Sequence, residues 1–383
     1  MSVSSRAEGT VRLTNSGPVE PCRVAATLRS FIYDIAPLID SSAPRSSFAV
    51  EVLEMARTSD AISEAITLVV KARLAHTRHS NEPRVSLAET RRAPADLSAR
   101  DEFAARVGHA LLTLESFFGT RPSDWSGIRV QYSRDGSPDT SLQSVKEPLQ
   151  SLLRYQIKIE LAQSLRTNTP LSEVLLSWVR LHPMSTPNSG PQSVCNASLC
   201  QLARCIDLIN RDFESAWATQ WALCTHWFQT RPPDMVPILE TSALEAAALT
   251  IGGPGFPVSL HSSPISLQAN VNMHLACLLL LKHKPGLSAA TRPQQPLESR
   301  SWHSEKIAGS LMWNTFKEQW DPILLGALLT IAEDMTHRAQ QLAIEECLQR
   351  ISREVGIDLR QEMTDLGRIW KAFQEDFDVD FDY

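Results

Sequence analysis

The sequence is poor in glycine, in closely spaced cysteines and in long apolar runs. It holds 15 glycines in 383 residues, and strand-like runs of Val, Ile, Thr and Tyr are scarce, which argues against a sheet protein. The longest apolar run, Leu275 to Leu281, falls far short of the roughly 20 residues that a membrane-spanning helix needs. Residues 1–20 are polar and lack the apolar core of a signal peptide. We therefore expect an intracellular protein with no membrane partner.

The overall charge argues against the whole chain being a partner for DNA. Lysine and arginine number 37 against 43 aspartates and glutamates, so the formal net charge is -6 and phosphates would not attract the chain. Apolar residues make up 43% of the sequence, which is enough for a sizeable core and excludes disorder of the whole chain. Long segments rich in Ala, Leu, Glu, Gln and Arg favour helices.

Apolar residues recur at intervals of three and four along most of the chain, which predicts amphipathic helices. Helices are expected at 21–39, 48–56, 59–79, 101–118, 148–165, 171–181, 195–227, 267–281, 304–314, 324–332, 338–355 and 361–373. Pro37 predicts a kink or an end near Ala36, because proline disrupts a helix interior. The segment 195–227 could form one long helix or two that are broken near Asn210.

The helix at 338–355 carries the clearest pattern. Its apolar stripe consists of Leu342, Cys347, Leu348, Ile351 and Val355. Gly356 follows directly and is well placed to end the helix in a left-handed conformation. Trp217, Trp227, Leu348 and Ile351 are expected in the core.

These patterns predict an all-α fold, with a single large multi-helix domain and long surface loops. The domain is expected to span 21–373, after a disordered segment at 1–20 and before an acidic-aromatic tail at 374–383. Loops are expected where proline, glycine and charged residues gather, at 80–100, 119–144, 182–192 and 284–300.

The seven cysteines do not form a metal-binding pattern. Cys195, Cys200 and Cys205 are evenly spaced, but a step of five residues turns a helix by about 500°, so their sulfurs would point to three different sides. No two cysteines are separated by two residues, as zinc clusters and fingers require. We expect buried, reduced thiols and no structural zinc.

Two histidine groups have some metal-binding potential. His76 and His79 stand three residues apart near a predicted helix end, but the nearest acid, Glu82, precedes a proline in a predicted loop. A solvated or capping role is favoured. His337 lies at helical spacing from Glu333 and Asp334, where a surface ion pair explains it more simply.

No catalytic motif was found. Gly252 to Gly255 precedes Phe-Pro and lacks the spacing and the following Lys and Ser of a phosphate-binding loop. The sequence therefore predicts no catalytic residue, no metal site and no cofactor.

The C-terminal tail alternates acids with Phe377, Val379, Phe381 and Tyr383. Such a composition is typical of disordered activating segments that dock hydrophobic side chains on a partner. A solvated acidic end explains it equally well. A calcium site is a weaker interpretation, because the glycine and the final glutamate of an EF-hand loop are missing.

A series of short pieces occurs in a defined order along the chain. The early pieces are Phe31 to Leu38, Phe48, Val52-Leu53, the helix from Ala61 to Leu74, and Trp217 and Trp227 before Arg231-Pro232-Pro233 and Pro237-Ile238. The later pieces are Met273-His274-Leu275-Ala276, Leu278 to Leu280, Ile307-Ala308-Gly309, Pro322-Ile323-Leu324, Gln340-Gln341, Leu348 to Ile351, Val355-Gly356, Leu366 and Trp370. Together, in this order and spacing, they resemble the fungal-specific transcription factor domain, the helical region that follows the zinc cluster in many fungal regulators. Met273 replaces the family's usual tyrosine.

The resemblance implies a regulatory, non-catalytic module in a fungal nucleus, with homodimer formation as an option. Its expected partners are proteins of the transcription machinery, a DNA-binding factor or a small effector, and its expected targets include the genes of a metabolic cluster. The family's six-cysteine cluster would precede residue 30, where this sequence has Cys22 alone. Direct sequence-specific DNA binding is therefore not expected.

Two other interpretations remain open. One is a helical enzyme of a biosynthetic pathway, which would need polar groups converging in a pocket. The other is a truncated fragment of a complete zinc-cluster factor, which upstream genomic sequence encoding the missing cysteines would establish.

We predict that the purified chain does not bind DNA sequence-specifically at physiological salt, because it has neither a zinc cluster nor a basic stripe. A mobility-shift selection from random duplexes tests this. A sequence-selective complex at nanomolar protein would refute the prediction.

Overall fold

The computed structural model describes residues 21–40, 47–77, 102–119, 121–122, 125, 148–181, 190–211, 213–241, 245, 255–285, 296–316 and 320–379. Within them the chain is almost entirely helical, and its sheet is one antiparallel pair of two-residue strands. The predicted all-α fold class is confirmed. The segments 1–20 and 80–100, and most of 119–144, lie outside the described residues.

The elements follow the predicted order closely. The first half contains α1 (Pro21–Ser30), a π-helix (Phe31–Ile35), α2 (Ala36–Ile39), α3 (Phe48–Ala56), α4 (Asp60–Thr77), α5 (Glu102–Gly119), α6 (Leu149–Thr167), α7 (Glu173–Leu181) and α8 (Pro191–Ile209). The second half contains α9 (Phe213–Thr230), a 3-10 turn (Pro233–Met235), β1 (Leu239–Glu240), β2 (Ser259–Leu260), α11 (Pro264–Lys282), a 3-10 turn (Pro296–Glu298), α12 (Arg300–Trp313), α13 (Pro322–Ala332), α14 (Arg338–Val355) and α15 (Arg360–Val379).

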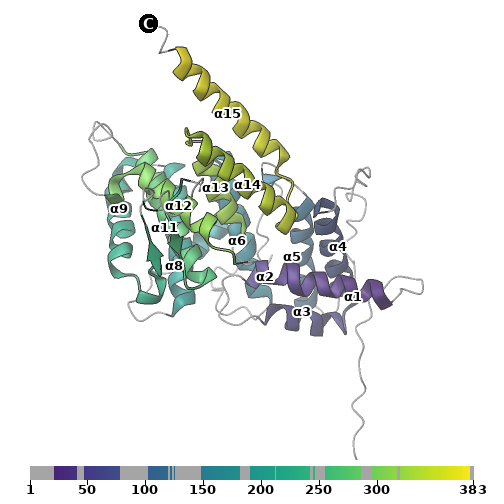
Figure 1. Ribbon diagram of the computed structural model, residues 1–383. Helices are drawn as coiled ribbons and strands as arrows, with labels where there is room; N and C mark the ends of the chain where they lie inside the picture. The colour runs from purple at the N-terminus through teal and green to yellow at the C-terminus, as the bar shows by residue number, and fades with distance from the viewer. Residues whose placement is uncertain are drawn as a thin grey trace, which may run out of the picture.

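The helices form two groups joined through a middle layer (Figure 1). Helices α1 to α5 gather at one side, while α8, α9, α11 and α12 gather at the other. Between them lie α6, α13 and α14, with α6 packed on α5, α8 and α13 and with α14 packed on α4. The buried apolar side chains form one cluster that extends through both groups.

Helix α11 is the centre of the second group, and it contacts α8, α9, α12 and α13. Every residue from Ser266 to Leu281 is buried. By length and mean hydropathy α11 could cross a membrane, but 89% of that stretch is buried inside the fold. It also carries polar residues at 268, 270, 272 and 274 that bond within the protein. These are the properties of a core helix.

A buried ion pair connects the middle layer to α11. Lys158 of α6 lies 2.8 Å from Asp321, and their side chains are 5% and 2% exposed. Lys158 also donates to Gln268 of α11, at 3.1 Å. The second oxygen of Asp321 accepts the amide of Leu324 and caps the start of α13. Three helices thus meet at one pair of charges.

Arg73 of α4 connects the π-helix near the N-terminus to the end of α14. Its guanidinium lies 3.2 Å from Asp34 in the π-helix and donates to the carbonyl of Glu354 in the last turn of α14. A cation at this position satisfies a carbonyl that has no partner within its own helix. The pKa of Arg73 is lowered by burial, and Asp34 opposes that shift.

Proline and glycine act as the sequence predicted at two positions. In a continuous α-helix the ring of Pro37 would clash with the carbonyl of Tyr33. The wider π-turn before Ala36 relieves this, and the Ala36 amide bonds to the Phe31 carbonyl. Gly356 has φ 86° and ends α14, as predicted.

Several helix starts lie earlier than predicted. Helix α8 begins at Pro191, inside the loop expected at 182–192, because proline suits a first helical turn. Helices α11 and α12 begin after Ser263 and Ser299, whose side chains cap the amides of the first turn. The segment 195–227 proves to be two helices, with the break near Asn210 as one of the alternatives proposed.

Two corrections concern the last helices. Leu342 is 43% exposed, so its place in the core stripe was wrong, and Gln341 is buried in its stead. Helix α15 continues to Val379, so the predicted end at Phe373 was wrong and the first part of the expected tail is helical. The C-terminal part of α15 projects from the body (Figure 1), and residues 371–373 are exposed.

Substitutions at Leu348 and Leu342 should separate core from surface. Leu348 is 0% exposed, so Leu348→Ala should lower the free energy of unfolding by about 2 to 5 kcal/mol. Leu342→Ala, on the same helix, should change it by less than about 0.5 kcal/mol. Urea denaturation measures both. Equal midpoints for the two variants would contradict the packing of α14.

Candidate functional site

The residues singled out in the sequence do not come together in one site. The side chains of His76, His79 and Glu82 lie outside the described residues. Glu333 pairs with Arg166 at 2.8 Å and Asp334 with Lys282 at 2.6 Å, so the acids expected to pair with His337 have other partners. Among the described residues, no group of three or more His, Cys, Asp or Glu is arranged to hold a metal ion.

The three cysteines of α8 are buried and free, as predicted. Burial raises the pKa of Cys195 to about 11 and that of Cys200 to about 12. The Cys195 thiol lies 4.0 Å from the Gln268 side-chain oxygen. Cys205, by contrast, lies beside Cys224 and Cys277. These different neighbours agree with sulfurs that point to different sides of the helix.

A buried polar layer, which sequence reasoning missed, lies between the β-strands, α11 and α12. We call it the histidine layer, and it consists of Ser259, His261, Ser266, Asn270, His274, His303, Ser310 and Asn314. All of these residues are less than about a tenth exposed. They come from two stretches of the sequence, 259–274 and 303–314, and no motif in either stretch indicates that these side chains meet.

His261 holds the turn after β2 against both helices. Its Nδ1 lies 3.3 Å from Ser266 Oγ, which itself donates to the Met235 carbonyl. The hydroxyl of Ser266 is thus available as an acceptor for Nδ1–H, which leaves Nε2 as an acceptor. Nε2 lies 3.0 Å from Ser310 Oγ and 3.4 Å from Ser259 Oγ, and Ser310 donates to Ser259 at 3.3 Å. Burial, and secondarily Arg231, lower the pKa of His261 to about 4. His261 is therefore neutral at physiological pH.

His274 of α11 and His303 of α12 share one hydrogen bond, with 2.9 Å between their Nδ1 atoms. The Nε2 of His303 lies 2.9 Å from the Leu297 carbonyl and must donate to it. Burial lowers the pKa of His303 to about 4 and that of His274 well below its ordinary value. With both rings neutral, His303 Nδ1 is the acceptor and His274 Nδ1 the donor.

Asn314 closes the layer at the end of α12. Its side-chain oxygen accepts the backbone amide of His261 at 3.0 Å, and its amide donates to the carbonyls of Ser259 and Ser310 at 2.7 Å each. Because the amide donors and the oxygen are all used, the layer ties β2 to α12 in one orientation.

Arg231 brings a positive charge to the edge of the layer. Its guanidinium lies 5.5 Å from the ring centre of Trp227 and 5.3 Å from that of Phe228, and it bonds to the Asn270 oxygen. Stacking on aromatic faces partly compensates the desolvation of the cation. Burial lowers the pKa of Arg231, and Glu240 opposes that shift.

The histidine layer contains reactive side chains, but neither of the two surface hollows reaches them. A serine hydroxyl beside an unprotonated histidine nitrogen is the arrangement from which a nucleophile can be activated. Ser310 is 1% exposed, however, and neither of the two hollows described below includes it. In this conformation the layer fixes β2, α11 and α12 relative to one another.

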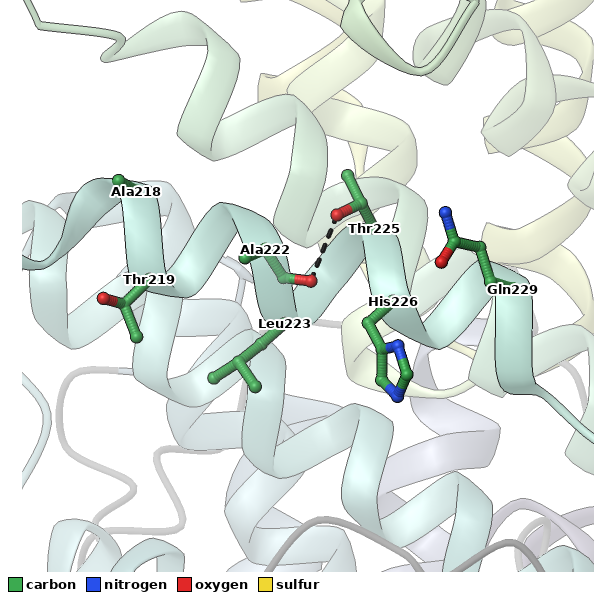
Figure 2. Close-up of a pocket in the computed structure, with 7 residues that line it drawn as sticks. All are labelled: Ala218, Thr219, Ala222, Leu223, Thr225, His226 and Gln229. Carbon is green, nitrogen blue, oxygen red and sulfur yellow. Dashed lines mark hydrogen bonds between the residues drawn. The ribbon is translucent and has the colours of Figure 1, made fainter.

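The larger surface hollow follows the outer face of α9 and has a volume of about 710 Å³. Figure 2 shows its lining side chains along this helix. They are Ala218, Thr219, Ala222, Leu223, Thr225, His226 and Gln229. The Thr225 hydroxyl bonds to the Ala222 carbonyl, so it is engaged by its own helix. The described lining comes from one helix and does not bring polar groups together from several elements.

A smaller hollow of about 110 Å³ lies between α6, α13 and α15. Its polar lining includes Glu333, Glu362 and Asp365, together with Arg166. Arg166 is paired with Glu333 and Gln361 with Asp365. This hollow is the contact region of the last helix with the body.

We predict that the histidine layer makes stability depend on pH. In the unfolded chain a histidine has a pKa near 6.5, while the folded pKa of His261 and His303 is about 4. Between these values the unfolded state binds more protons, so the stability present above pH 6.5 falls as the pH drops. Each histidine should remove up to about 3 kcal/mol from the free energy of unfolding.

Urea denaturation at pH 7 and pH 5 measures this loss. His303→Gln should reduce the difference between the two pH values, and His226→Gln, at an exposed position of α9, should leave it unchanged. A wild-type stability that is the same at both values would contradict the burial of neutral histidines.

The chain matches no protein-family model, no curated protein and no solved structure in comparisons with known proteins.

Proposed function

We propose that the chain is a transcription regulator of the fungal zinc-cluster type. It acts in the nucleus through protein partners or a small effector, without a zinc cluster of its own, and regulates genes such as those of a metabolic cluster. The observation that carries this proposal is that most of the segments resembling the fungal regulatory domain, which are scattered over the sequence, lie in helices that pack against one another, and that several make specific contacts there.

The Ile307-Ala308-Gly309 piece supports this proposal through its glycine. A Cβ atom at Gly309 would lie 2.2 Å from the Pro257 carbonyl oxygen, a distance that no side chain tolerates. The absence of a side chain lets α12 approach the segment before β2 and complete the histidine layer. This requirement explains a glycine in a buried helix, where it otherwise costs about 1 kcal/mol.

Polar groups of three other pieces bond to backbone carbonyls outside their own helices. Trp217 donates to Leu280 and Trp370 to Ala332, at 2.9 Å each. Gln341 donates to the Met335 carbonyl at 3.0 Å. A generic helical core needs only apolar side chains at such positions, so these bonds support a specific resemblance. Trp227 is buried as expected, whereas Trp217 is only partly buried.

Deletion of the gene should alter a defined set of transcripts, and chromatin immunoprecipitation of the tagged chain should recover the promoters of those genes. Recruitment by a partner is expected, so removal of that DNA-binding factor should abolish the promoter signal. Unchanged transcripts together with no promoter signal would refute the proposal. Accumulation of a metabolic intermediate in the deletion strain would instead favour the alternative that the chain is a helical biosynthetic enzyme.

Two glycine variants provide a matched control. Gly309→Ala forces a backbone clash and should fail to restore the transcripts. Gly367→Ala meets nothing within 4 Å and should restore them fully, since alanine favours the helix by about 0.5 to 1 kcal/mol. If both variants restore the transcripts equally, the function does not depend on the close packing at Gly309, and the support drawn from that glycine is lost.

A further inference from the structure

Three cysteines from three helices meet where the inner face of α9 packs on α8 and α11. Cys205 of α8, Cys224 of α9 and Cys277 of α11 are each 0% exposed and free. Cys224 lies within hydrogen-bond reach of both other thiols, and its sulfur also accepts from the Gln201 amide at 3.4 Å. The spacing along α8 alone could not reveal this cluster, because two of its members lie outside α8.

The surroundings shift the pKa values of the three thiols in different directions. Hydrogen bonds from Cys205, Cys277 and Gln201 stabilise a thiolate at Cys224 and lower its pKa. Burial, followed by the hydrogen bond to Cys224, raises the pKa of Cys205 and of Cys277. Cys224 is thus the central thiol of the cluster, and either neighbour lies where it can form a disulfide with it.

The other described cysteines do not share this arrangement. Burial raises the pKa of Cys195, Cys200 and Cys347. The Cys347 thiol accepts a hydrogen bond from Arg350, at 3.6 Å. Because a disulfide needs a second thiol at close range, these three positions are internal controls for the cluster.

We propose that Cys205, Cys224 and Cys277 form a peroxide-sensitive thiol site that locks α9 to the body of the protein. When α9 opens, the Cys224 thiol loses its proton to water and its thiolate attacks one oxygen of a hydroperoxide. The O–O bond breaks, the released alkoxide or hydroxide takes up a proton, and the oxidised sulfur is a sulfenic acid. When α9 closes again, the thiol of Cys205 or Cys277 attacks this sulfur, forming a disulfide and releasing one water molecule.

An oxidant can reach the buried thiols when helix α9, whose outer face lies at the surface, opens locally. Ala222 and Leu223 line the outer hollow (Figure 2), while the next residue of the same helix, Cys224, is completely buried. Local opening of one surface helix requires less free energy than global unfolding. A disulfide to α8 or α11 would then hold α9 in place, so oxidation should suppress later opening. This inference does not depend on the proposed transcriptional role.

Mild hydrogen peroxide followed by thiol alkylation and peptide mass spectrometry tests the site in the full chain. The expected product is an internal disulfide that contains Cys224 and is reversed by dithiothreitol. Hydrogen exchange of the α9 amides should slow after oxidation. No disulfide at Cys224, or equal oxidation of Cys347, would overturn the proposal.

Single substitutions identify the reacting pair. Cys205→Ser leaves Cys277 as a partner and Cys277→Ser leaves Cys205, so at least one of these variants should still form the disulfide. Cys224→Ser should abolish it, and Cys347→Ser should not affect it. If Cys224→Ser does not fold, loss of the disulfide in the double variant Cys205→Ser/Cys277→Ser, with Cys224 intact, gives the same information. Persistence of the disulfide in that double variant would overturn the assignment.

Discussion

The packing of the two helical groups depends on the ion pair between Lys158 and Asp321. Both charges are almost completely removed from water, and the desolvation cost of such a pair is large, so its main contribution is to fix positions. Removal of one partner of a buried pair typically costs about 3 to 5 kcal/mol, because the other charge is left without compensation. Here the same two side chains also start α13 and contact α11. The register of three helices is therefore set at one point.

The parts of the fold that could be predicted are those decided by neighbouring residues. The end of α14 at Gly356 and the disruption at Pro37 follow from backbone chemistry within one turn. The start of α12 was predicted four residues too late, at 304. The N-cap preference of Ser299 would have predicted the observed start at Arg300. The stripe of α14 shows the limit. Hydrophobicity pointed to Leu342, whereas the buried position belongs to Gln341, whose amide has a partner at Met335.

The candidate sites depend on contacts between distant segments and could not be read from the sequence. His274 and His303 lie 29 residues apart and share a proton only because α11 and α12 are packed together. Cys224 likewise meets one cysteine before it and another after it in the chain. No local pattern marks such a meeting, since a lone cysteine or histidine in a helix most often has only a packing role. The structure is needed to show which of them face one another.

The bond from Arg73 to Glu354 has a consequence for synthesis on the ribosome. The two residues are 281 positions apart, so helices α1 to α4 leave the exit tunnel long before α14 exists. Until then Arg73 lacks this carbonyl, and the side of α4 that α14 covers remains exposed. Chains emerge at about 5 to 20 residues per second, and unfinished apolar faces attract chaperones or aggregate. The nascent chain must therefore wait on the order of 14 to 56 seconds for its closing helix.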